Sequence, residues 1–195
     1  MKRICVFCGS NAGARSEYAE AARALAAILV ERKLGIVYGG GKVGLMGVLA
    51  DAAIEHGGEV IGVIPQSLLD KEVGHRGVTE LMVVETMHER KARMNNLSDA
   101  FIALPGGFGT LDEFFEVLTW AQLGLHRKPC ALFNVAGYYD SLLAMLDHAA
   151  TERFLRPAHR GLVIADTDPL RLLQRLSAFS PAPKEKSDKE KRNFL

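Results

Sequence analysis

The sequence is poor in features that would tie it to a nucleic acid, a membrane or a disulfide framework. It has three cysteines and one tryptophan, and 24 Lys and Arg residues nearly balance 23 Asp and Glu residues, for a formal net charge of +1. A balanced charge gives no support for a surface that binds nucleic acid or an anionic membrane. No apolar run is long enough to span a bilayer. Three cysteines are an odd number and do not suggest a disulfide framework.

The few cysteines also give little sign of redox or metal chemistry. Cys5 and Cys8 have the C-x-x-C spacing, but redox pairs with this spacing lie at a helix N-terminus, where the thiolate is stabilised. No second pair or histidine cluster completes a zinc site. Residues 1–6 enter a strand-like run directly and lack the small-residue cleavage pattern of a signal peptide. We therefore expect a cytoplasmic protein with no metal and no nucleic acid or membrane partner.

Apolar runs alternate with helical patterns along most of the chain. The expected strands cover residues 2–8, 34–38, 59–64, 80–85, 99–104, 128–134 and 161–165. Strands that are apolar throughout and alternate with helices predict a parallel sheet covered on both faces. We expect an α/β fold, a Rossmann-like doubly wound parallel sheet of about seven strands with helices on both faces, in a single domain over residues 1–180. Residues 181–195 are rich in Pro, Lys, Glu and Ser and are expected to form a charged, flexible tail.

The first of two glycine-rich loops follows the second expected strand. It contains Gly39, Gly41 and Gly44 in the spacing G-x-G-x-x-G. A dinucleotide site would add an Asp or Glu about 20 residues further on to bind the ribose, and residues 63–66, Val-Ile-Pro-Gln, offer no acid. Lys42 is followed by valine, not by the Ser or Thr of an ATP-binding loop. We expect this loop to approach a ligand or the second loop closely, and we expect no cofactor.

The second glycine-rich loop lies between an apolar run and a helical pattern. Residues 105–113 are Pro-Gly-Gly-Phe-Gly-Thr-Leu-Asp-Glu. A glycine turn between a strand and a helix start can hold an anion with backbone N–H groups and the helix dipole. Such a site would not need the acids Asp112, Glu113 and Glu116. Thr110 and Glu113 have the S/T-x-x-E spacing of a capping box, so the sequence leaves Glu113 open to a structural or a chemical role.

A basic pair stands in the first turn of the helix expected over residues 87–97. Arg90 and Lys91 lie beside the apolar positions Met87 and Met94. Two cations near the positive end of a helix dipole require a compensating negative charge. The strands before this helix and before the acid-bearing loop can be neighbours in a doubly wound sheet, which would bring the two charge groups together. A glycine loop, basic groups and a carboxylate indicate a site for a phosphorylated sugar.

Residues 105–113 resemble the P-G-G-x-G-T-x-x-E signature of the Lonely Guy proteins, cytokinin-activating phosphoribohydrolases long mislabelled as lysine decarboxylases. The resemblance extends over roughly residues 3–180 and includes further blocks in family order: residues 8–10, 38–41, 44–47, 87–91 and 119–124. The sequence departs mildly from the family pattern at two positions. Asp112 stands where many members have Glu, and Phe108 stands where Tyr is frequent. The decarboxylase label itself would require a Schiff-base lysine and a pyridinium partner, and no residue here supports that chemistry.

The resemblance implies an enzyme of one nucleotide-binding catalytic domain. It would hydrolyse the N-glycosidic bond of AMP or N6-prenylated AMP to a free base and ribose 5-phosphate. It implies Arg90 and Glu113 as the catalytic pair. The residues implied to contact the nucleotide are Ser10, Glu72, Met87, Lys91, Gly106, Gly107, Phe108, Gly109, Thr110 and Thr119. The resemblance also suggests a homodimer, with Trp120 and Leu123 as candidate interface residues.

These residue types suit the implied reaction. Loss of a purine leaves positive charge on the ribose, as in glycoside hydrolysis, and Glu113 can stabilise that charge and orient or deprotonate a water. Arg90 stays protonated, so we assign it to orienting Glu113 or the phosphate, or to polarising the leaving base. A non-catalytic nucleotide-binding or carrier protein on the same fold is the alternative, and an NAD oxidoreductase is a third, weaker one.

Overall fold

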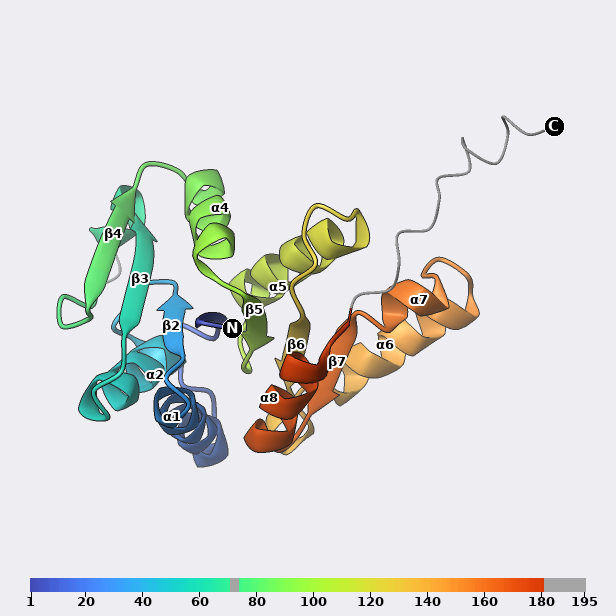
Figure 1. Cartoon of the computed structure of the whole chain (residues 1–195), viewed down its shortest axis with the longest axis horizontal. Coiled ribbons are helices and arrows are strands. Elements are labelled where there is room, and N and C mark those ends of the chain that lie inside the picture. Colours follow the sequence, from blue (N-terminus) through green and yellow to red (C-terminus); the bar gives the residue numbers. More distant parts are fainter. Residues whose placement is uncertain (71–73, 181–195) are drawn as a thin grey trace.

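A computed structural model describes residues 1–70 and 74–180, and these form one parallel sheet of seven strands with helices on both faces (Figure 1). The order across the sheet is β4-β3-β2-β1-β5-β6-β7. The strands are β1 (Arg3–Phe7), β2 (Gly35–Tyr38), β3 (Val60–Pro65), β4 (Glu80–Val84), β5 (Ala100–Ala103), β6 (Cys130–Phe133) and β7 (Val163–Asp166). The expected Rossmann-like α/β fold is confirmed. The tail expected over residues 181–195 lies outside the described residues.

The helices divide between the two faces of the sheet. They are α1 (Ser16–Glu31), α2 (Gly44–Glu55), α3 (Gln66–Leu69), α4 (Met87–Leu97), α5 (Phe108–Gln122), α6 (Asp140–Thr151), α7 (Pro157–Arg160) and α8 (Pro169–Ala178), with a short 3-10 turn η1 (Val135–Gly137). One core cluster contains residues of α1, α2 and α8, and the other contains residues of α4, α5 and α6 (Figure 1). No helix in the described ranges has the length and apolarity needed to cross a bilayer.

The central strand β1 marks the point where the direction of winding reverses. It pairs with β2 on one side and with β5 on the other, and both pairings are parallel. In open α/β sheets the ligand crevice lies at the carboxyl ends of the strands at such a reversal. The fold therefore places a site at the ends of β1 and β5, next to both glycine-rich loops.

One expectation about the sheet is wrong. The strands before the two charge-bearing helices, β4 and β5, are not neighbours, because β3, β2 and β1 lie between them. Helix α4 spans the distance between them. It follows the edge strand β4 and packs across β3, β2 and β1 before the chain enters β5. The basic pair on α4 thus reaches the central crevice by a long crossover, not by strand adjacency.

Candidate active site

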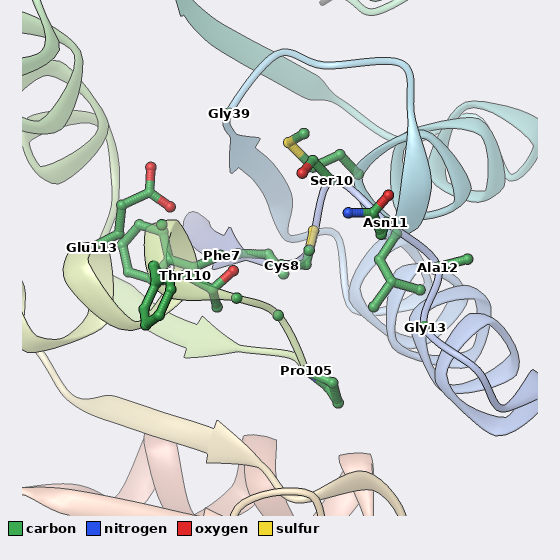
Figure 2. Close-up of a pocket in the computed structure, with 18 of the residues that line it drawn as sticks. Phe7, Cys8, Ser10, Asn11, Ala12, Gly13, Gly39, Pro105, Thr110 and Glu113 are labelled. Atoms are coloured by element: carbon green, nitrogen blue, oxygen red, sulfur yellow. The ribbon is translucent and has the colours of Figure 1, made fainter.

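A cavity of about 370 Å³ lies at the carboxyl edge of the sheet. It is lined by the loops after β1, β2 and β5, and by residues of α4 and α5. Figure 2 shows Glu113 at one end of this cavity, Cys8 in the middle and Asn11 to Gly13 at the other end. Burial raises the pKa of the Cys8 thiol well above its usual value, so Cys8 is an apolar wall residue and not a thiolate nucleophile.

The three loops interlock through their backbones. The Gly9 N–H donates to the carbonyl of Pro105 at 3.1 Å, and the Leu45 N–H donates to the carbonyl of Gly9 at 3.0 Å. Gly44 has a φ of +60° and comes so close to the 10–11 backbone that a Cβ would lie 2.3 Å from the carbonyl carbon of Ser10. The close neighbour of Gly44 is thus the loop after β1 and not the second glycine loop. The approach of the first glycine loop to a ligand stays a prediction.

Helix α5 begins at Phe108, with Gly107 as its N-cap and no side-chain cap. The capping box expected from Thr110 and Glu113 is therefore wrong, because both residues lie inside the helix. The first N–H to enter the helical ladder belongs to Leu111, which donates to Gly107. The N–H groups of the first turn have no intrahelical partner. They lie at the cavity and form a positive helix end suited to an anion.

Arg90 and Glu113 form a buried ion pair inside the cavity. Their side chains approach to 3.3 Å, between Nη1 and Oε1. Nε of Arg90 donates to the carbonyl of Val63 at 3.0 Å, and Nη2 donates to the carbonyl of Gly39 at 3.2 Å. Backbone groups after β2 and in β3 thus fix the guanidinium on two sides and leave Nη1 facing the carboxylate.

Glu113 is 9% exposed, and burial raises the pKa of its carboxyl group, although the charge of Arg90 opposes this shift. Its Oε1 is buried and accepts no hydrogen bond among the described residues. A buried carboxylate oxygen with no hydrogen-bond donor is costly and is seldom found without a functional reason. Oε1 therefore relies on the charge of Arg90, whose Nη1 lies 3.3 Å away without hydrogen-bond geometry.

The other acids of α5 balance the second cation of α4. Nζ of Lys91 lies 2.7 Å from Oδ2 of Asp112 and 3.4 Å from Oε1 of Glu116. Burial lowers the pKa of Lys91, but the two acids outweigh this effect and raise it overall. Acidic side chains therefore balance the charges of the basic pair, as expected. These ion pairs connect α4 to α5 beside the cavity.

Most of the residues implied by the resemblance meet at this cavity. Those that line it are Ser10, Arg90, Gly106, Gly107, Phe108, Gly109, Thr110 and Glu113. Met87, Lys91 and Thr119 do not line it; Met87 is half-exposed and touches Arg90 through its sulfur, and the Thr119 hydroxyl donates to the carbonyl of Phe115. Glu72 lies outside the described residues. The binding roles of all these residues remain predictions.

Several lining residues have no signal in the sequence. Asn11, Tyr18 and Tyr138 line the cavity, and Figure 2 shows Asn11 at the end remote from Glu113. The hydroxyl of Tyr138 donates to the carbonyl of Gly106 at 2.6 Å. Tyr138 belongs to a connection beyond β6 that no glycine motif or charge pattern marks, so only the fold brings it to the site.

Comparisons with known proteins agree with this geometry. A family model described as "Possible lysine decarboxylase" matches residues 46–176. A cytokinin riboside 5'-monophosphate phosphoribohydrolase of Arabidopsis thaliana is 50% identical over 180 residues, which cover 92% of this chain and 79% of the relative. The chain belongs to the Lonely Guy family. A probable cytokinin riboside 5'-monophosphate phosphoribohydrolase of Oryza sativa subsp. japonica is 52% identical over 180 residues, which cover 92% of this chain and 79% of the relative.

Solved structures outside the Lonely Guy family share the fold. The molybdenum cofactor carrier protein of Chlamydomonas reinhardtii has a TM-score of 0.68 and 20% identity, over 91% of this chain and 99% of that chain. The molybdenum cofactor binding protein of Rippkaea orientalis has a TM-score of 0.69 and 21% identity, over 91% and 97% of the two chains. At this identity the likeness shows the architecture alone.

Proposed function

We propose that this protein hydrolyses the N-glycosidic bond of a purine nucleoside 5'-monophosphate, AMP or N6-prenylated AMP, to the free base and ribose 5-phosphate. The observation that carries the proposal is the buried pair of Arg90 and Glu113, which stands beside the open N-terminus of α5 in one cavity. Relatives that are about half identical carry the name of this reaction. The small-molecule substrate follows from the same comparison.

The 5'-phosphate belongs at the glycine loop. The free N–H groups of Phe108, Gly109 and Thr110 in the first turn of α5 suit a phosphate, and the helix dipole adds to the attraction. Glu113 follows Gly109 by one helical turn and lies on the same cavity wall. A phosphate held at the loop thus leaves the ribose within reach of the carboxylate.

Glu113 then acts on the sugar carbon that loses the base. Cleavage puts positive charge on the ribose, which a carboxylate in a low-dielectric site stabilises strongly. The carboxylate can also orient or deprotonate the attacking water. Arg90 keeps its proton; it holds the carboxylate in place and favours the ionised form that the reaction needs.

A carrier protein on the same fold is the second candidate, because the molybdenum cofactor carriers share the architecture. A binder needs no carboxylate buried at the wall of its ligand cavity, so the Arg90 and Glu113 pair favours an enzyme. A Schiff-base decarboxylase is not favoured, because no lysine lines the cavity within the described residues. The near balance of charge supports the proposal that the protein has no nucleic acid partner, and we propose a cytoplasmic location.

The proposed assembly is a homodimer that uses α5. Leu123 and Leu125, at the end of α5, are 66% and 70% exposed, and Trp120 in the last turn of α5 is partly exposed. Large apolar side chains gathered at one helix end favour contact with a partner surface. A second copy of the chain is the proposed partner.

Turnover decides between the enzyme and the carrier. The purified protein is incubated with AMP and with its N6-isopentenyl derivative, and chromatography follows the free base and ribose 5-phosphate. We expect both products in equal amounts, and the ratio of kcat/KM for the two substrates identifies the preferred base. Binding of both nucleotides without release of either base would support the carrier instead.

The raised pKa of Glu113 gives the rate a defined pH dependence. We expect kcat to fall as the pH drops through this pKa, which lies above the usual 4.5 because burial disfavours the charged form. The same shift means that the ionised carboxylate destabilises the fold at neutral pH, and that this cost is relieved as the pH falls through the raised pKa. The charge of Asp112 contributes to raising the pKa of Glu113. Asp112→Asn should therefore move the fall of kcat on the acid side of the pH profile, the acid limb, to lower pH.

The measurement is kcat against pH for the unmodified protein and for Asp112→Asn. The control is Glu20→Gln, which removes an exposed acid of α1 that is not among the charges acting on Glu113. The assignment of the acid limb to Glu113 would be contradicted if Asp112→Asn left the limb in place or moved it to higher pH.

A further inference from the structure

Three successive carbonyl groups of the second glycine loop are held by donors outside the loop. The carbonyl of Leu104 accepts from the hydroxyl of Tyr139 at 2.7 Å, and that of Pro105 accepts from the N–H of Gly9 at 3.1 Å. The carbonyl of Gly106 accepts from the hydroxyl of Tyr138 at 2.6 Å. Two adjacent tyrosines therefore anchor the loop on one side, and the loop after β1 anchors it on the other.

The bond to Gly106 fixes more than one atom. A trans peptide unit is planar, so the carbonyl of Gly106 and the N–H of Gly107 point in opposite directions. When Tyr138 holds the carbonyl, it also holds the N–H of the N-cap residue, which faces away from the hydroxyl. A Cβ on Gly106 would lie 2.1 Å from Oγ1 of Thr110 and 2.8 Å from the backbone nitrogen of Gly9, so the peptide is tightly enclosed.

The backbone before Tyr138 is strained in a way that places the two tyrosines. Ala136 has a φ of 50° and Gly137 a φ of 74°. The left-handed region costs a residue with a side chain about 1–3 kcal/mol, and such strain concentrates at functional sites. The side chain of Asn134 holds the turn, since its Oδ1 accepts from the N–H of Tyr139 at 2.7 Å. The strained turn thus presents both hydroxyls to the loop.

The ring of Tyr138 is fixed as well. It packs edge-to-face against Tyr139, with ring centroids 5.0 Å apart, and against Tyr18, with centroids 5.8 Å apart. Tyr138 is still 43% exposed and lines the cavity. Two aromatic contacts hold the ring, and the hydroxyl donates to the carbonyl of Gly106. Tyr138 therefore stabilises the position of the glycine loop.

We propose that Tyr138 is a positioning residue that orients the Gly106–Gly107 peptide for the 5'-phosphate, and that it thereby sets the preference for a nucleoside 5'-monophosphate over the nucleoside. The proposal rests on the proposed function, because it takes the second glycine loop as the phosphate site. A loop released from Tyr138 would offer its N–H groups in several orientations, and the phosphate would have to order them on binding.

The test is Tyr138→Phe, which removes the hydroxyl and keeps the ring. Calorimetric titration with ribose 5-phosphate should show a Kd raised about fivefold to tenfold, as expected for one hydrogen bond. For AMP we expect a rise in KM of similar size with kcat nearly unchanged. For adenosine, which lacks the phosphate, kcat/KM should not change, so the preference for AMP over adenosine falls. An equal loss for both substrates would show a general structural defect and overturn the proposal.

Tyr18→Phe is the matched control. It removes a hydroxyl from a lining residue whose ring packs against Tyr138. This hydroxyl makes no hydrogen bond among the described residues, so its loss should weaken ribose 5-phosphate binding less than Tyr138→Phe. Equal binding by Tyr138→Phe and the unmodified protein would overturn the inference. If the unmodified protein binds ribose 5-phosphate but does not cleave AMP, the proposed enzyme fails while the titration still decides the role of Tyr138. If it binds no phosphate compound, both fail.

Discussion

Glu113→Gln is expected to lower kcat for AMP by about a thousandfold, the range over which general bases and charge-stabilising groups act. Glutamine has nearly the shape of glutamate but carries no negative charge, so it cannot offset the charge that develops on the ribose. It also cannot take a proton from water. The phosphate site at the start of α5 is untouched, because Glu113 lies beyond the first turn of the helix. Binding of AMP should therefore change only a few-fold.

The measurement combines single-turnover kinetics with calorimetric binding of AMP. Glu116→Gln is the matched control, since Glu116 is on the same helix and pairs with Lys91 but does not line the cavity. We expect this control to keep activity within about tenfold of the unmodified protein. A Glu113→Gln variant that kept more than a tenth of the activity would show that another group carries the chemistry.

Gly39→Ala is expected to lower kcat by about a hundredfold, through a change that adds one methyl group. A Cβ at this position would lie 2.2 Å from Nη2 of Arg90 and 3.2 Å from the sulfur of Met46. The guanidinium would have to leave its place beside Glu113, and displacing a catalytic group by about 1 Å can cost about 10²-fold. Removal of Arg90 from the pair also raises the pKa of Glu113 further, because the charge of Arg90 opposes the effect of burial.

The comparison for Gly39→Ala is Gly161→Ala. A Cβ at Gly161 would meet its nearest neighbour, the carbonyl oxygen of Ala158, at 3.4 Å, which is ordinary van der Waals contact. Thermal unfolding of both variants shows whether each still folds. The kcat for AMP is then measured for both. Near-normal turnover by a folded Gly39→Ala would mean that the position of the Arg90 guanidinium is not critical.

Much of the fold follows from the local pattern of the sequence. Helix α4 spans the expected residues, Met87 to Leu97. Its start is fixed by Thr86, which accepts the N–H of Glu89 at 3.1 Å. The apolar strands and the glycine turns after them predict the parallel sheet and the edge that bears the site. The charge argument also succeeds: the cations of α4 do meet the acids of α5.

The sequence pattern fails where the answer depends on contacts between distant segments. The spacing of Thr110 and Glu113 matches a capping box with Thr110 as the N-cap, but the N-cap of α5 is Gly107, three residues earlier. Nothing local distinguishes the direction of the Lys91 side chain, which turns to the acids of α5, from that of Arg90, which enters the cavity. The role of Tyr138 depends on a loop that lies 32 residues before it in the chain.

The proposed active site is divided between two parts of the polypeptide, which meet where β1 pairs with β5. Arg90, Gly39 and Val63 belong to the part that builds β1 to β4 and α4, whereas Glu113 and its loop follow β5. A fragment that ended before β5 would carry the guanidinium and its backbone partners without a carboxylate, and the remaining fragment would carry the carboxylate alone. Neither fragment would hold the ion pair, so the proposed chemistry requires that β5 has docked against β1.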